Sequence, residues 1–221
     1  MYVLHTRPDS AGVAVHLVLQ ELGLPFTLHI VSRDTGEHET PEYRALHPLG
    51  LVPALETPDG PMFETAAILL WLADRHKTLA PLPTDTDRAA FLTWYFFTNT
   101  NLHTTLMHLF YPDRYTGGPE GVSAFLQAGA TRMADQLRLL DGMVATGPRW
   151  CDPQTPSILG YYLAMLVRWI GSYEQGHPGR IDLSAYPALM ALARALEQRP
   201  AALHVAEAEG LGPTIFTNPT Y

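Results

Sequence analysis

The sequence predicts an α/β domain at the N-terminus and an all-helical domain after it. Strand and helix patterns alternate up to about residue 77, whereas strand signals largely vanish from residue 86 onward. Residues 78–85 hold two prolines and no hydrophobic periodicity, which is typical of a linker. The expected division is therefore a domain at 1–77, a linker at 78–85 and an all-helical domain at 86–221.

The composition excludes several classes of protein. Of the 221 residues, 47% are hydrophobic and 16% are charged, which is enough apolar material for a packed core. A net charge of −8 makes nucleic acid a poor partner. The longest apolar run, Ala66 to Ala73, is too short to cross a bilayer, and we expect no secretory signal. Cys151 is the single cysteine, so no intrachain disulfide can form, and we expect a cytoplasmic protein.

The first expected elements are a strand, a helix and a second strand. Residues 2–6 have strand character, and Ser10 can cap a helix that runs to Leu22. Apolar residues of this helix recur at the spacing i, i+3, i+4, i+7, namely Val15, Val18, Leu19 and Leu22. Glycine and proline end the helix, and residues 26–31 alternate in character as a strand does.

A hairpin and a covering helix follow a short helix at about 41–46. Pro53 has no backbone N–H, so it suits the first residue of a strand, and Pro58-Asp59-Gly60 predicts a tight turn into a second short strand. The next helix opens at Glu64-Thr65 and is apolar nearly all round, so we expect it to be buried on most faces. Together these elements give the thioredoxin-like order.

The second half of the chain is expected to be helical. Helices are predicted at roughly 86–110, 120–145, 157–171 and 186–198, with a short final turn at 200–207 and an irregular tail at 210–221.

The residues around Pro53 and Glu64 have the properties of a site for a peptide-like ligand. The residue before a proline favours extended geometry, and a cis Val52–Pro53 bond, which we predict, would turn the Val52 backbone outward to pair with a peptide. The helix N-terminus at Thr65 offers free N–H groups to a carboxylate, since no capping box uses them. Glu64 would receive an amino group. The alternative is that Pro53 only begins a strand and Thr65 only caps a helix.

Several segments together resemble motifs of the cytosolic glutathione transferase family. Residues 47–55, His-Pro-Leu-Gly-Leu-Val-Pro-Ala-Leu, resemble Asn-Pro-x-Gly-x-Val-Pro-Ala-Leu, and residues 63–68 resemble the Glu-Ser-x-Ala-Ile motif. Tyr161-Tyr162-Leu163-Ala164 and Tyr186-Pro187 resemble the family's second domain. The likeness covers essentially the whole chain and is closest to the bacterial, beta-like members.

This resemblance implies a cytoplasmic, homodimeric enzyme with glutathione as co-substrate. Its thioredoxin-like domain would bind glutathione, its helical bundle would complete the pocket, and the thiolate would attack a small apolar electrophile. Val52 would pair with the cysteinyl backbone, and Glu64 and Thr65 would hold the γ-glutamyl end. The expected glutathione site comprises Arg7, Leu51, Val52, Pro53, Glu64 and Thr65.

Thiolate activation is expected at the start of the first helix. The Ser10 hydroxyl and the Ala11 N–H can donate hydrogen bonds to sulfur, although Ser10 could equally be a plain N-cap. Arg7 could favour a thiolate or be simply solvated. His103, in Asn101-Leu102-His103, resembles the Glu-Leu-His histidine of beta-like members, and its alternative role is structural. Tyr95, Asn99 and Tyr111 are the expected acceptor pocket.

Departures from the motifs support a second hypothesis. Ala11 stands where beta-like relatives carry a cysteine, Leu51 replaces a polar residue, and Gly160 replaces the acid of Ser-x-x-Asp. The chain could therefore be a binding or regulatory protein with weak or no turnover. Glutaredoxin-type thiol exchange is excluded because the first helix has no cysteine. His103 and His108 are five residues apart, so they do not share a helix face, and no metal site is expected.

Overall fold

A four-stranded mixed sheet organises the N-terminal part of the chain, whose computed structural model describes residues 1–219. The strands are β1 (Tyr2–Thr6), β2 (Phe26–Ile30), β3 (Ala54–Thr57) and β4 (Gly60–Phe63). Their order is β2-β1-β3-β4, with β1 parallel to β2 and antiparallel to β3. The hairpin β3–β4 completes the expected thioredoxin-like order.

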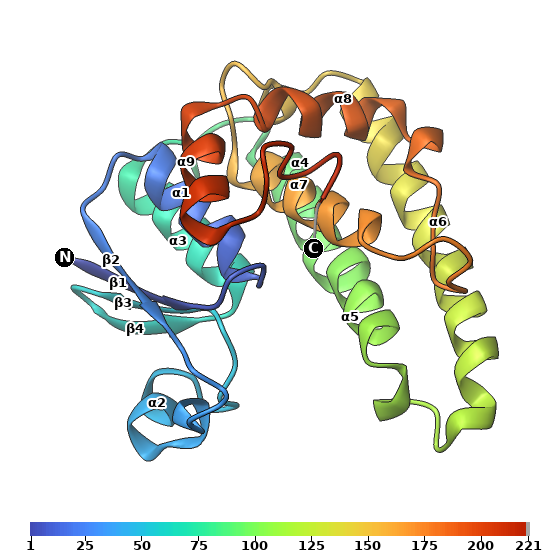
Figure 1. Cartoon of the computed structure of the whole chain (residues 1–221). Coiled ribbons are helices and arrows are strands. Elements are labelled where there is room, and N and C mark those ends of the chain that lie inside the picture. The colour runs from blue at the N-terminus through green and yellow to red at the C-terminus, as the bar shows by residue number, and fades with distance from the viewer. Residues whose placement is uncertain (220–221) are drawn as a thin grey trace.

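Helices cover both faces of this sheet. The helices α1 (Gly12–Glu21) and α3 (Thr65–His76) lie on one face, and the short α2 (Pro41–Leu46) lies on the opposite side (Figure 1). Strand residues alternate between the faces. Leu4 pairs with Leu55 across the strands, and both are fully buried in the core.

Local sequence explains where the first elements begin. The Val52–Pro53 peptide bond is cis, as predicted, and β3 starts directly after it. The helix α1 starts one residue later than a Ser10 cap implies, because its N-cap is Ala11 and its first residue is Gly12. Gly12 is required there, because a Cβ atom on it would lie 1.8 Å from the Thr6 hydroxyl oxygen.

The expected burial of α3 is correct for one side only. Ile68, Leu69 and Leu72 are fully buried, whereas Ala67 is exposed and Trp71 is partly buried. The second layer therefore leaves part of the helix surface uncovered within the described chain.

The remaining elements are helical. They are α4 (Arg88–Phe97), a π-helix (Thr98–His103), α5 (Thr104–Phe110), α6 (Val122–Ala145), α7 (Ile158–Gly171), α8 (Pro187–Leu196) and α9 (Pro200–Glu209). Short 3-10 turns occur at Glu37–Glu39, Pro112–Arg114, Pro119–Gly121, Arg149–Cys151 and Leu183–Ala185. The helix α7 is central, since every residue from Ile158 to Ile170 is buried.

Two sequence expectations about these helices were wrong. The segment 86–110 is not one regular helix, because threonine hydroxyls compete for its backbone carbonyls: Thr98 bonds the Trp94 oxygen and Thr100 bonds the Phe96 oxygen. The expected final turn is the ten-residue helix α9, which lies beside α1 (Figure 1). Its buried side is formed by small residues such as Ala201 and Ala202, which give a weak hydrophobic pattern.

Because Gly160 replaces the acid of the Ser-x-x-Asp motif, the start of α7 has only one of the two hydrogen bonds of a capping box. Ser157 Oγ accepts a hydrogen bond from the Gly160 N–H at 3.0 Å and donates to the Trp150 carbonyl at 2.6 Å. Gly160 has no side chain, so it cannot return the second bond of a capping box.

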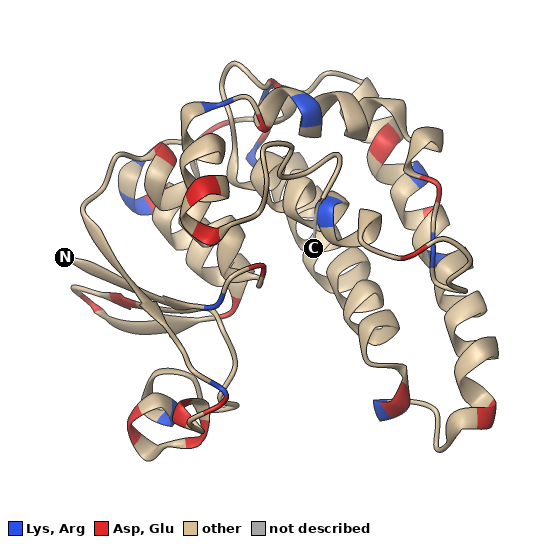
Figure 2. Ribbon diagram, viewed as in Figure 1, with Lys and Arg blue, Asp and Glu red and all other residues tan. Residues whose placement is uncertain are grey.

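Acidic and basic residues are spread over both parts of the ribbon (Figure 2). The domain boundaries at residues 77 and 86 stay a prediction. From residue 1 to residue 219, none of the helices has the length and apolar character to cross a membrane. Residues 220–221 of the expected tail lie outside the described part.

Candidate functional site

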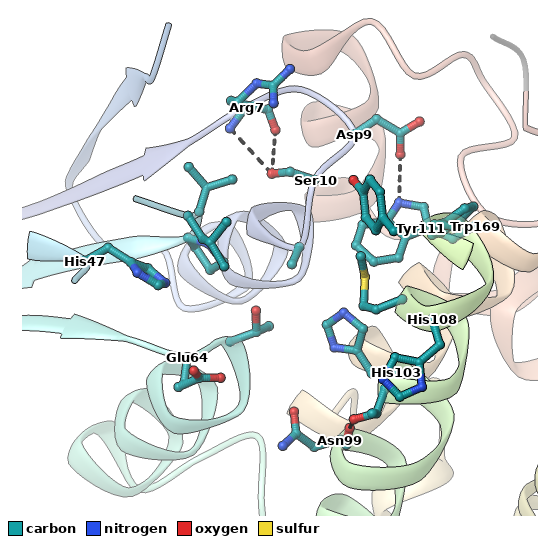
Figure 3. A pocket seen from close by; sticks show the side chains of 18 of the residues that line it. Arg7, Asp9, Ser10, His47, Glu64, Asn99, His103, His108, Tyr111 and Trp169 are labelled. Carbon is teal, nitrogen blue, oxygen red and sulfur yellow. Dashed lines mark hydrogen bonds between the residues drawn. The ribbon is translucent and has the colours of Figure 1, made fainter. Parts of the chain in front are cut away.

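A cavity of about 760 Å³ lies between the sheet and the helices that follow it. Figure 3 shows His47 and Glu64 on one side and Asn99, His103 and His108 on the other. The structure brings together nearly all the predicted site residues around it: Arg7, Ser10, Ala11, Leu51, Val52, Pro53, Glu64, Thr65, Asn99, His103 and Tyr111.

Tyr95 is the exception, and the sequence-based placement of it was wrong. Its side chain is fully buried and its hydroxyl donates to the Ala66 carbonyl oxygen at 2.5 Å. Burial raises its pKa well above the ordinary value. Tyr95 therefore connects α4 to the first turn of α3 instead of facing a ligand.

The start of α1 presents an amide to the cavity. Ser10 Oγ donates to the Arg7 carbonyl oxygen at 2.7 Å and accepts from the Gly12 N–H at 3.2 Å (the first of these is drawn in Figure 3). The single hydroxyl hydrogen of Ser10 is thus already used. The Ala11 N–H, by contrast, has no acceptor among the described residues. A helix N-terminus with a free N–H favours an anion.

Asp9 fixes the loop that carries Ser10 and Ala11. Its carboxylate accepts two bonds from the Arg168 guanidinium, at 2.8 and 2.9 Å, and a third from the Trp169 indole N–H at 3.1 Å. Its backbone N–H donates to the Glu209 carboxylate, which also bonds the buried His16. Asp9 has a φ of +52°, an unusual value for a non-glycine residue.

The backbone around Glu64 and Val52 is also available to a ligand. Glu64, the N-cap of α3, has a φ of +72°, and no described group bonds to the Thr65 hydroxyl. Val52 makes no backbone hydrogen bond within the described chain, whereas the Leu51 carbonyl accepts one from the Tyr43 hydroxyl at 2.7 Å. Asp9 and Glu64 both have a positive φ and both line the cavity, and strained backbone of this kind is typical of a binding site.

His103 belongs to a hydrogen-bonded chain with two other side chains. The Tyr162 hydroxyl donates to Asn99 Oδ1 at 2.9 Å and lies 2.5 Å from His103 Nδ1. Because that hydroxyl has one hydrogen, His103 Nδ1 must be the donor of the second bond. Desolvation of the imidazole lowers the pKa of His103 to about 4. His103 is therefore neutral near pH 7, with Nε2 as a hydrogen-bond acceptor.

His47, which replaces the usual asparagine, organises the loop before Pro53. Its Nδ1 accepts from the Leu49 N–H at 3.3 Å, and its ring lies 4.9 Å from the Phe63 ring. Desolvation lowers the pKa of His47, against the opposing effect of Glu64. Cys151 is far less suited to chemistry, since burial raises the pKa of its thiol to about 12.

Sequence reasoning missed several residues that line the cavity. They include Arg33, His108, Arg114, Tyr115 and Trp169. Arg114 and Tyr115 follow α5 in a segment without periodicity, and Trp169 lies on a helix that is apolar all round. For Arg114 and Tyr115, one signal was available in the sequence: they follow closely after Tyr111, which was predicted to line the pocket.

Residues 13–75 match the family model of the glutathione S-transferase N-terminal domain. Glutathione S-transferase GST-4.5 of Xanthomonas campestris is 29% identical over 94% of this chain and 98% of its own length. A sphingomonad glutathione S-transferase solved in complex with glutathione has a TM-score of 0.75 at 29% identity, covering 95% of this chain and 100% of that one. The beta-class enzyme of Sphingomonas chungbukensis has a TM-score of 0.74 at 27% identity, covering 95% and 100%.

Proposed function

Because the chain belongs to the glutathione S-transferase family, we propose that it binds glutathione in this cavity and adds the glutathione thiolate to an electrophile. The observation that carries the proposal is the convergence of three free backbone features on one cavity. These are the Val52 backbone beside its cis bond, the N-terminus of α3 at Thr65 and the Ala11 N–H. They suit an extended peptide, a carboxylate and a thiolate.

The proposed orientation of glutathione follows from these groups. Val52 pairs with the cysteinyl backbone, next to Leu51 and Pro53. The γ-glutamyl carboxylate binds the backbone N–H and the hydroxyl of Thr65, and the ammonium of the same γ-glutamyl group faces Glu64. The sulfur then lies toward Ala11, Ser10 and Arg7, and the acceptor lies on the side of Asn99, His103 and Tyr111.

Thr65→Ala should weaken glutathione binding by about 1–2 kcal/mol, because the hydroxyl would bond a charged carboxylate. Calorimetric titration measures this affinity directly. Thr93→Ala, on an exposed turn of α4, is a matched control that should leave the affinity unchanged. Equal affinities for wild type and a folded Thr65→Ala protein would disprove this orientation.

Thiolate activation is proposed to come from the Ala11 N–H, because the Ser10 hydrogen is engaged by the Arg7 carbonyl. Arg7 adds a cation nearby. Neutral His103 can accept a hydrogen bond from the thiol or the acceptor, but it supplies no positive charge at pH 7.

Ala11→Pro should raise the pKa of bound glutathione and lower kcat near pH 7, since proline has no N–H to donate. The native φ of −59° at Ala11 suits proline. Ultraviolet titration of the bound thiolate measures the pKa. Ser10→Ala keeps the amide and removes only the hydroxyl, so a rise in pKa in that variant alone would transfer the role to Ser10.

A binding or regulatory protein with weak turnover is the second candidate. The specific observation in its favour is that neither Ser10 nor Ala11 offers a free hydroxyl or thiol to the sulfur. Calorimetry with glutathione followed by a turnover assay with an aryl halide separates the two. Binding with turnover supports the transferase, binding without turnover supports the second candidate, and no binding contradicts both.

We further propose a cytoplasmic homodimer with domains at 1–77 and 86–221. Helix α4 is joined to α3 by the Tyr95–Ala66 and Arg88–Asp74 hydrogen bonds, and it also carries uncovered apolar side chains: Phe96 is 46% exposed, and Leu92 and Trp94 are partly exposed. An apolar surface of this kind favours association with a second copy. Sedimentation equilibrium should give twice the chain mass, and Phe96→Glu should lower it.

A further inference from the structure

Three arginines line the cavity without a carboxylate partner. Arg7, Arg33 and Arg114 make no ion pair within the described chain. The carboxylates that line the same cavity are Asp9 and Glu64, and Asp9 is already held by Arg168. A chain with 22 acidic and 14 basic residues therefore has a locally cationic cavity.

Glutathione accounts for two of these three cations. This count rests on the proposed function. Its γ-glutamyl carboxylate binds the α3 N-terminus and its ammonium neutralises Glu64, so neither needs an arginine. The glycine carboxylate and the thiolate remain, which are two anions for three guanidinium groups. One arginine is left for the other substrate.

Arg114 is the arginine on the acceptor side. It ends the 3-10 turn that follows α5, and its guanidinium carbon lies 4.1 Å from the centroid of the Tyr111 ring. Stacking of this kind fixes the planar guanidinium and leaves its N–H groups free to bind a carboxylate at two points.

Further aromatic rings line the same cavity as Arg114 and Tyr111. The His108 ring lies 4.3 Å from the Tyr115 ring, and Phe110 and Trp169 have ring centroids 6.1 Å apart. All four residues line the cavity. A cavity that combines aromatic side chains with a guanidinium stacked on Tyr111 matches a flat ligand with an anionic edge.

We propose that the second substrate is an aromatic electrophile that carries a carboxylate, and that Arg114 binds this carboxylate while the rings of Tyr111 and Tyr115 contact its apolar part. This proposal replaces the small apolar electrophile expected from the sequence with an aromatic electrophile that carries a negative charge. The charge also opposes the net charge of −8, so the cavity selects anions that the rest of the surface repels.

Two glutathione conjugates test this without any turnover. S-benzylglutathione and S-(4-carboxybenzyl)glutathione differ only in the carboxylate, and calorimetry gives the ratio of their affinities. Wild type should bind the carboxylated conjugate about five- to tenfold more tightly. Arg114→Ala should reduce this ratio to about one, and added salt should reduce it as well. Arg132→Ala, an exposed arginine of α6 outside the cavity, should keep the wild-type ratio.

The outcomes separate this inference from the function on which it rests. Binding of both conjugates with a ratio near one in wild type, or a ratio unchanged in Arg114→Ala, would overturn the inference and leave glutathione binding intact. If neither conjugate nor glutathione binds, the proposed function is wrong and the inference falls with it.

Discussion

Asp9→Ala should lower the free energy of unfolding by about 3 kcal/mol, because it removes the Asp9 carboxylate from the buried guanidinium of Arg168. Arg168 is 1% exposed at its side chain and donates two bonds to Asp9. The variant removes the Asp9 carboxylate from that guanidinium, and the Trp169 indole N–H loses the same acceptor. Urea unfolding measures the change.

Asp135→Ala is the matched control for this prediction. The Asp135 carboxylate lies 3.6 Å from the Arg138 guanidinium, but the two side chains are 69% and 70% exposed. Such a surface pair contributes little, so the control should change stability by less than about 0.5 kcal/mol. A loss below about 1 kcal/mol in Asp9→Ala would mean that the pair does not stabilise the fold.

The second large effect concerns the dependence of stability on pH at His103. Its pKa falls from 6.5 to about 4 on folding, so between these values the unfolded chain binds more protons. Stability therefore rises with pH across this window and is lost as the pH falls through it. Between pH 7 and pH 5 this one group should destabilise the native state by about 2 kcal/mol.

His103→Gln should remove that part of the pH dependence. The free energy of unfolding in urea is measured at pH 7 and at pH 5 for both proteins. The change between the two pH values in the wild type, minus the same change in the variant, is the contribution of His103. The lost bond to Tyr162 affects both pH values and cancels. His204→Gln, at an exposed position of α9, should keep the wild-type difference. If His103→Gln keeps it too, the imidazole is not desolvated as its surroundings imply.

The sequence predicted the N-terminal fold and the cavity lining around Pro53 and Glu64 well, because the signals there are local. A proline before a short strand, a turn and a helix start lie within 20 residues, and each constrains the backbone directly. The cis bond at Val52–Pro53 and the positions of Glu64 and Thr65 follow from this stretch.

The opposite side of the cavity, formed by the helical part of the chain, could not be predicted equally well, because its contacts join distant segments. Tyr95 and Asn99 are one helical turn apart, yet Tyr95 faces the core and Asn99 lines the cavity. An aromatic residue on a helix gives the same sequence pattern in both cases. The insertion of a π-helix after Phe97 also changes which side chains face the cavity, and no hydrophobic period reveals it.

The hydrogen bonds that hold Asp9 also determine when, during protein synthesis, the loop before α1 can take its final shape. The side chain of Asp9 is held by residues about 160 positions later, and its backbone N–H by Glu209, 200 positions later. A ribosome releases the sheet and α1 long before those residues exist. The amide of Ala11 therefore cannot be held in place by all of these contacts until residue 209 has been translated.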